Sequence, residues 1–187
     1  NGQVLTLGSG AQTFAGVISG QGGLTANGAL QTLSGNNTYT GPTTINGGAI
    51  VKQAADSTTG DITVSGDNMT FALDGGITDG AGQTLYMQGR GDTSGNYFFT
   101  GSAVQRGALQ ALHGANTWQG NVVLTATGSP TTPNRIGVQD GASLTLTGVI
   151  SESNAGSILL FRAGNAGSDI TLGGSGSYTY TGETQMF

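Results

Sequence analysis

The sequence predicts an all-β chain folded as a single right-handed parallel β-helix, or β-solenoid, with Gly/Asn-rich turns and one larger inserted loop. Three observations carry this prediction. Short runs of about four to six residues end at glycine along the whole chain. Many of these runs alternate apolar and polar residues, as a strand with one buried face does. A turn–strand motif also recurs, and right-handed crossovers dominate between parallel strands.

Composition supports a folded repeat over a disordered or fibrous chain. Glycine supplies 36 of the 187 residues, while charged residues make up 8% and hydrophobic residues 35%. Disordered chains usually carry more charge and less apolar content. With only three prolines, collagen and polyproline architectures are excluded.

Charge and cysteine content limit the partners that we expect. The net charge is −5, and the five lysines and arginines are scattered along the sequence. Binding nucleic acid requires a basic stripe, so no nucleic-acid partner and no direct membrane insertion are expected. Cysteine is absent, so stability has to come from stacking and not from disulfides. No apolar run approaches the roughly 20 residues of a membrane helix.

The expected strands are short and are bounded by residues that tolerate positive φ, such as Asn46-Gly47-Gly48, Asp74-Gly75-Gly76 and Asp140-Gly141. These strands are Val4–Leu7, Thr13–Ile18, Thr43–Asn46, Ala49–Lys52, Asp61–Val64, Met69–Leu73, Gln83–Met87, Tyr97–Thr100, Asn121–Thr127, Arg135–Val138, Ser143–Leu146, Ser157–Phe161 and Asp169–Leu172.

Two kinds of anchor alternate along the chain. A Gly-x-Ile or Gly-Ile anchor ends at Ile18, Ile77 and Ile150, and a Leu-x-Gly anchor follows each of them. The order is fixed while the spacing varies, which indicates a solenoid with insertions between coils. We therefore expect one solenoid segment over residues 1–187, with repeat anchors near 14–52, 77–124 and 148–187 and an insertion at about 89–105. Coils of roughly 20 residues would give about nine coils and a rod on the order of 40 Å long. The segment is expected to belong to a longer chain or to be completed by a neighbouring subunit.

The Leu-x-Gly anchors open the motif LSGNNTYTGPTTINGGAIVK at Leu33, with a weaker copy at Leu112 and a third at Leu172. Residues expected to form this structural repeat are Leu33, Gly35, Asn37, Tyr39, Gly41, Ile45, Gly48, Ile50, Leu112, Gly114, Asn116, Trp118, Gly120, Leu172, Gly174, Tyr180 and Gly182. The corner asparagines Asn36, Asn37 and Asn116 are expected to bond to the backbone.

The motif resembles the passenger-associated transport repeat of bacterial autotransporters. The resemblance is close over residues 12–52, loose over 112–150 and 172–187, and poor over 53–111. The second copy departs from the family pattern with His113 in place of a small residue and Trp118 in place of tyrosine. The resemblance implies an extracellular or cell-surface passenger of a Gram-negative bacterium, exported through an outer-membrane barrel.

The sequence gives little evidence of a catalytic site. A glycosidase needs two carboxylates flanking a groove, and only Asp74 and Asp79 are expected to converge across a corner. Turn chemistry accounts for the other acids next to Gly, Asn or Ser, namely Asp67, Asp140 and Asp169. His113 is the single histidine, too few for a zinc site, and no G-x-S-x-G elbow accompanies it. We expect no enzyme activity, no cofactor and no metal, although calcium at an Asp-rich turn stays open.

One ligand-like motif stands out. Arg90-Gly91-Asp92 opens the expected insertion, where an exposed, tightly turned loop would suit integrin-type receptor binding; chance occurrence of the tripeptide is the competing explanation. In the same insertion, Tyr97, Phe98 and Phe99 are expected to be core residues, with an exposed binding patch as the alternative.

Three functions follow in order of preference. The first is a non-catalytic solenoid that acts as a stalk or scaffold for adhesion and aids its own secretion. The second is a subunit of an extracellular fibre, joined end to end by β-strand addition. The third is a carbohydrate-active β-helix enzyme. The expected partners are neighbouring segments of the same protein, identical subunits, or a host-cell or surface receptor.

Overall fold

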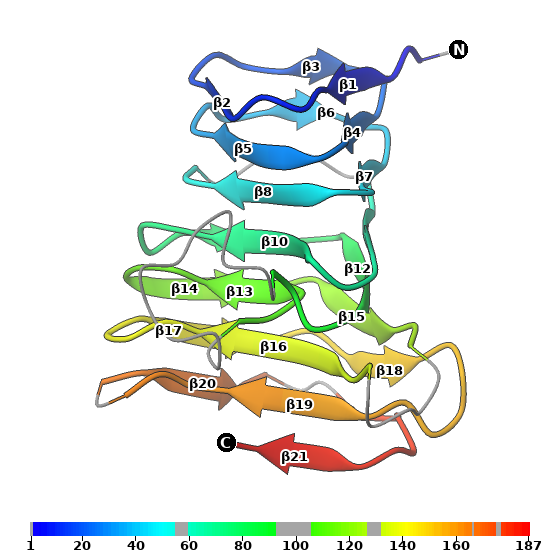
Figure 1. The fold of residues 1–187 in the computed structure, drawn as a ribbon, viewed down its shortest axis with the longest axis vertical. Helices are drawn as coiled ribbons and strands as arrows, with labels where there is room; N and C mark the ends of the chain where they lie inside the picture. Colours follow the sequence, from blue (N-terminus) through cyan, green and yellow to red (C-terminus); the bar gives the residue numbers. More distant parts are fainter. Residues whose placement is uncertain (1, 55–59, 93–105, 127–131, 166, 175–176) are drawn as a thin grey trace.

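The computed structural model describes residues 2–54, 60–92, 106–126, 132–165, 167–174 and 177–187. Short parallel strands stack into a rod with the two chain ends at opposite poles (Figure 1). Glycine-rich corners connect the strands, so each coil visits the faces of the rod in turn. The expected parallel β-solenoid is confirmed.

Two long parallel sheets run the length of the rod. Sheet A contains seven strands: β1 (Leu5–Leu7), β4 (Leu24–Ala26), β7 (Thr43–Ile45), β9 (Ile62–Ser65), β12 (Thr84–Gln88), β15 (Asn121–Leu124) and β18 (Ile150–Glu152). Sheet B contains eight: β2 (Gln12–Phe14), β5 (Ala29–Leu33), β8 (Gly48–Lys52), β10 (Met69–Leu73), β13 (Leu109–Ala111), β16 (Asn134–Val138), β19 (Leu159–Arg162) and β21 (Thr184–Met186).

A third face closes the coil with shorter sheets. Its strands are β3 (Ser19–Gly20) and β6 (Thr38–Tyr39) in one sheet, and β11 (Thr78–Asp79), β14 (Ala115–Trp118), β17 (Ser143–Leu146) and β20 (Asp169–Leu172) in the other. The chain passes from sheet A to sheet B to this third face and then returns to sheet A. Because nearly every strand pairs above and below, open backbone edges are confined to the ends of these stacks.

Coil length is regular at first and then grows. Leu24 pairs with Leu5 and with Thr43, so the first coils take 19 residues each. Later coils are longer: Phe71 pairs with Leu109, a separation of 38 residues. Sheet B has eight rungs where about nine were expected, because the insertions consume chain without adding rungs. At about 4.8 Å per rung the stack is about 34 Å long.

Side chains of one type lie above one another inside the rod. On sheet B the paired positions Ile50, Phe71, Leu109, Ile136 and Phe161 form one buried apolar column. Inward-facing positions repeat in register from coil to coil, so the alternation of apolar and polar residues in the sequence builds a continuous core. The expected interior ladders of Leu, Ile, Val and Phe are confirmed.

Some local predictions fail. Several strands fall outside the expected ranges, namely β3, β4, β5, β6, β11, β13, β14, β18 and β21. The expected strand Thr13–Ile18 is a strand only as far as Phe14. The chain of β13 reads Gly-Ala-Leu-Gln-Ala-Leu, which favours a helix by local propensity, but stacking between β10 and β16 makes it a strand. The expected strand at Tyr97–Thr100 and most of the expected insertion lie outside the described residues.

Candidate functional site

The repeat motif forms the corners of the rod. In the first copy, Leu33 ends β5, Tyr39 ends β6, and Ile45 and Ile50 lie in β7 and β8. All four side chains are buried in the core. The motif therefore provides one turn of the coil, from sheet B through the third face and sheet A back to sheet B.

Each motif copy sits on the isoleucine anchor of the preceding coil. The amides of Thr38, Thr117 and Thr179 donate to the carbonyls of Ile18, Ile77 and Ile150, at 2.8, 2.8 and 3.0 Å. These are corresponding positions of the three motif copies. The two anchor types that alternate in the sequence are thus hydrogen-bonded partners between coils.

The corner asparagines join successive coils. Asn37 accepts from the amide of Ile18 at 2.9 Å and donates to the carbonyl of Gly35 at 3.0 Å. Asn116 accepts from the amides of Gly76 and Ile77, both at 3.1 Å. Both asparagines are 1% exposed.

Asn116 also donates to the carbonyls of His113 and Gly114, at 2.9 and 3.2 Å. One amide group therefore satisfies backbone groups on two coils, which a turn of this kind needs when it is buried. The neighbouring Asn36 is exposed, so the two adjacent asparagines of the first copy have different surroundings.

Glycine is required where corners stack. A Cβ added to Gly41 would lie 2.5 Å from the carbonyl carbon of Gly22 in the preceding coil. A Cβ on Gly60 would in turn clash with the carbonyl of Gly41. Gly22, Gly41 and Gly60 therefore form a column at which only a hydrogen side chain lets the backbones approach.

A tyrosine–threonine pair marks the motif and was missed from the sequence. The Tyr39 hydroxyl lies 2.6 Å from Thr43 Oγ1. At the same spacing of four residues, the Tyr180 hydroxyl lies 2.5 Å from Thr184 Oγ1. In the second copy these positions hold Trp118 and Val122, so both hydroxyls are lost together. The pattern Tyr-Thr-Gly-x-Thr occurs twice in the sequence and could have predicted this tyrosine–threonine pair.

The third copy occupies a different face of the rod. Thr43 lies in sheet A, whereas its counterpart Thr184 lies in sheet B. The isoleucine anchor changes face as well. Ile18 and Ile77 directly precede strands of the third face, whereas Ile150 begins β18 of sheet A and pairs with Tyr178. Leu172 lies on the third face and is 44% exposed, unlike the buried Leu33. The motif thus specifies a corner and its bond to the previous coil, and the face can change.

Trp118 fills the core below its corner. It is fully buried and meets the ring of Phe71 edge-on, with centroids 5.5 Å apart and an interplanar angle of 73°. Leu112 differs from Leu33 because it packs outside sheet B, against Val51 and Ala72. The second copy therefore keeps the corner, but its Trp118 packs in the core and its Leu112 packs outside sheet B.

The acids expected to converge do not share a partner. Asp79 is buried and forms an ion pair with Lys52, whose ammonium also lies 5.9 Å from the Phe71 ring centroid. Asp74 is half-buried, with a carboxylate oxygen 2.7 Å from Nδ1 of the exposed His113 and another 2.9 Å from Gln53 Nε2. One acid thus balances a buried lysine and the other links exposed corners. Lys52, a charged residue in a core column, was not singled out from the sequence.

The remaining acids mostly bond to turns. Asp140 accepts from the amide of Asn165 at 2.6 Å, and Glu152 accepts from the Thr181 hydroxyl and amide at 2.6 and 2.9 Å. The Thr181 hydroxyl is the main reason that the pKa of Glu152 lies below its ordinary value. Within the described ranges, no three His, Cys, Asp or Glu side chains gather as a metal-binding group would.

The Arg-Gly-Asp tripeptide differs from an exposed receptor loop. Asp92 is fully buried, and its amide donates to Thr70 Oγ1 at 3.1 Å. Arg90 pairs with Asp67 at 3.0 Å. Burial raises the pKa of Asp67, but its bonds and charge interaction with Arg90 outweigh burial and lower it overall. The carboxylate is not presented at the surface, so the receptor expectation gains no support here. Tyr97, Phe98 and Phe99 lie outside the described residues.

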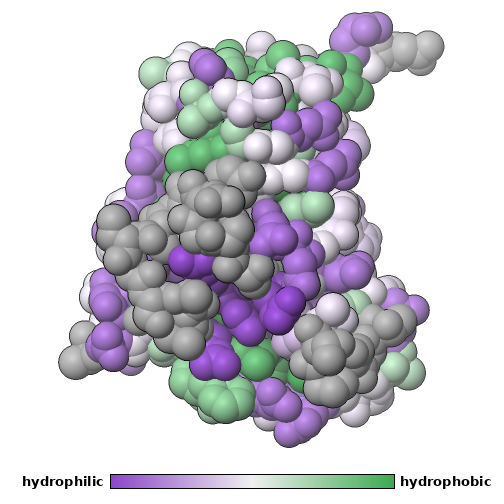
Figure 2. All heavy atoms as spheres, in the orientation of Figure 1, coloured by the Kyte–Doolittle hydropathy of each residue, from purple (hydrophilic) through white to green (hydrophobic). Residues whose placement is uncertain are grey.

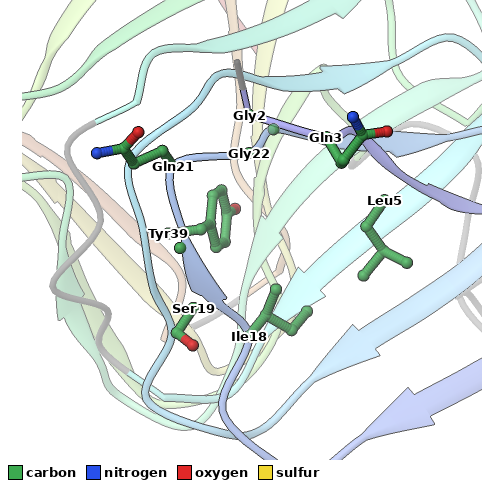
Figure 3. A pocket seen from close by; sticks show the side chains of 10 residues that line it. Gly2, Gln3, Leu5, Ile18, Ser19, Gln21, Gly22 and Tyr39 are labelled. Carbon is green, nitrogen blue, oxygen red and sulfur yellow. The ribbon is translucent and has the colours of Figure 1, made fainter.

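Two hollows lie at the ends of the rod. The larger, about 370 Å³, lies among the first two coils, and Leu5, Ile18 and Tyr39 surround it (Figure 3). None of the described residues that line it is charged. The second, about 230 Å³, lies by Phe161, Ile170 and Met186 at the other end. Both resemble uncovered ends of the core more than clefts with convergent polar groups.

Comparison with known proteins agrees with the corner geometry. Among the described residues, no helix has the length and apolar character of a membrane span. No curated protein and no solved structure matches the chain. The family model of the passenger-associated-transport-repeat matches residues 30–51, which run from β5 through β8. The chain therefore carries a repeat that is typical of autotransporter passenger domains, which are typically surface-exposed or secreted.

Proposed function

We propose that this chain is a structural, non-catalytic part of the β-solenoid passenger of an autotransporter-like protein on the surface of a Gram-negative bacterium. It acts as a stalk or scaffold for adhesion. The observation that carries this proposal is the use of the motif residues: Asn37, Asn116 and Gly41 all serve contacts between successive coils. A motif devoted to stacking is what a scaffold requires.

The same geometry supports a role in secretion. Each coil pairs with the coils directly before and after it, so folding can propagate one coil at a time. A coil that folds outside the cell gains hydrogen bonds and buried apolar surface that oppose backward movement of the chain. Export and folding would then be coupled through the corners.

Surface display tests this coupling. The chain is placed between a signal peptide and an outer-membrane barrel, and surface protein is measured by protease accessibility on whole cells. Gly41→Val introduces a clash with Gly22 and is expected to lower surface protein several-fold. Gly8→Val is the matched control, because a Cβ on Gly8 meets nothing within 4 Å. Normal display of Gly41→Val, with the purified variant unfolded, would contradict the coupling of folding and export.

A second candidate is an end-to-end fibre. The large exposed apolar side chains lie mostly in the first and last coils; they are Val4, Leu5 and Val17 at one end and Leu172, Tyr178, Met186 and Phe187 at the other. Such surfaces suit the stacking of a further coil, from the same polypeptide or from an identical chain. Sedimentation over a concentration series separates the two: a fibre grows with concentration, and a stalk segment does not.

A further inference from the structure

The structure gathers three arginines that are far apart in the sequence. Arg135 lies in β16 and Arg162 in β19, on adjacent rungs, and both alternate with buried core residues such that they lie on the outer side of sheet B. Arg90 joins them because the Arg135 amide donates to the carbonyl of Gly89 at 3.0 Å. Hydrophilic residues collect across the middle of this face (Figure 2). Three cations that are scattered along the sequence are therefore brought together in three dimensions.

Positive charge in this arginine cluster, Arg90, Arg135 and Arg162, is only partly balanced. Asp67 pairs with Arg90. Neither Arg135 nor Arg162 has an ion-pair partner in the part of the chain that the structure describes. The residues left undescribed contain a single acid, Asp56.

Repulsion and burial act on the middle arginine of the cluster. Burial first, and then the charges of Arg162 and Arg90, lower the pKa of Arg135 from its ordinary value to about 10. Arg135 remains charged at neutral pH, so the cluster contains three positive guanidinium groups and one carboxylate, that of Asp67. A bound anion would relieve this repulsion. The remaining two cations of the chain, Lys52 and Arg106, are buried and pair elsewhere, with Asp79 and the carbonyl of Asp92.

We propose that the arginine cluster is a binding site for a linear anionic polysaccharide whose sulfate or carboxylate groups accept hydrogen bonds from Arg135 and Arg162. Guanidinium groups suit planar oxyanions because their donors are fixed in a fork. Arg135 and Arg162 stand on successive rungs of sheet B, offset by two positions along the strands, so a polymer with regularly repeated charges can contact both of them.

The neighbouring groups favour a glycan over an acidic protein surface. Gln185, on the next rung, pairs with Leu160 and adds an amide to the same face. The ring of Phe187, 65% exposed, lies 4.3 Å from the guanidinium carbon of Arg162. Amide, aromatic ring and guanidinium together offer polar and apolar contacts to a sugar ring. This binding role goes beyond the scaffold and does not rest on it.

Binding to immobilised dextran sulfate, with neutral dextran as the blank, tests the proposal on the whole chain. Arg135→Gln/Arg162→Gln is expected to weaken binding roughly tenfold, since Arg135 and Arg162 are half-buried and each charge contact at the surface contributes severalfold. Gln3→Glu/Gln21→Glu is the charge-matched control: it removes the same net charge at exposed positions of the first coils and should change binding less than about twofold. Asp67→Asn frees Arg90 and should strengthen binding about twofold.

Each outcome decides the proposal. Loss of binding in the arginine variant, retention in the control and weakening between about 50 and about 300 mM NaCl support the site. Carboxylated alginate is run beside dextran sulfate to distinguish the two anion types. Failure of the wild-type chain to bind either polymer at low salt would overturn the proposal, as would unchanged binding by Arg135→Gln/Arg162→Gln. Equal binding of a DNA oligonucleotide, lost in the same variant, would overturn the assignment to a glycan.

Discussion

Replacing Asn116 tests whether the corner asparagines hold the coils together. Asn116→Ala removes four hydrogen bonds: two accepted from the amides of Gly76 and Ile77, and two donated to the carbonyls of His113 and Gly114. The carbonyls of His113 and Gly114 each keep a second donor, the amides of Gly75 and Ser143, so each bond is assigned about 0.5–1 kcal/mol. The expected loss of unfolding free energy is then about 2–4 kcal/mol.

Urea unfolding followed by circular dichroism measures this loss. A change of that size lowers the urea midpoint by about 1 M when the m-value is about 2–3 kcal/mol/M. Asn36→Ala is the matched control, because Asn36 has the same side chain but lies exposed beside Asn37; it should change stability by less than about 0.5 kcal/mol. Equal midpoints for Asn116→Ala and Asn36→Ala would refute the assignment of the corner asparagine to coil stacking.

Two further changes probe the core and the last corner. Trp118→Ala removes a fully buried indole packed against Phe71 and should cost about 3–5 kcal/mol in urea unfolding, whereas Tyr86→Ala, at an exposed position, should cost far less; similar costs would contradict the packing described. The pKa of Glu152 is lowered by the Thr181 hydroxyl, so its carboxylate stabilises the fold above about pH 4.5, and this contribution is lost as pH falls through the depressed pKa. Glu152→Gln should therefore be less stable than wild type at about pH 6, and the difference should shrink at about pH 3; an unchanged difference would argue against the Glu152–Thr181 link.

The architecture was predictable because it depends on local chemistry. Glycine punctuation, period-two runs and a repeated motif are all visible in the sequence, and they identified the solenoid and most strands. β13 escaped because its residues Leu109–Ala111 favour a helix locally, and only pairing with the strands above and below makes it extended. Propensity was overridden by stacking.

Features that depend on coil register were not predictable. The arginine cluster exists because the coils that contain Arg135 and Arg162 are 25 residues apart at Ile136 and Phe161, a length that the sequence does not mark. The pairing of Lys52 with Asp79 and the shift of the third motif copy to another face have the same origin. Insertions of variable length make the register of the coils unpredictable from the sequence, whereas each corner can be predicted from its own residues.

Engineered cysteines give the most direct test of the central claim that these residues stack as coils outside the cell. The chain has no native cysteine, so any disulfide reports the introduced pair. Thr25 and Thr44 are register partners on neighbouring rungs of sheet A, and Thr63 lies one rung further on. Two rungs span about 9.6 Å, beyond the roughly 7 Å that a disulfide can bridge between Cα atoms.

The measurement is the gel mobility of the surface-displayed protein after mild oxidation. The stacked solenoid predicts that Thr25→Cys/Thr44→Cys forms a crosslink in the surface-exposed fraction and that Thr25→Cys/Thr63→Cys does not. Equal crosslinking of both pairs, or none in the register pair, would contradict the stacked-coil account.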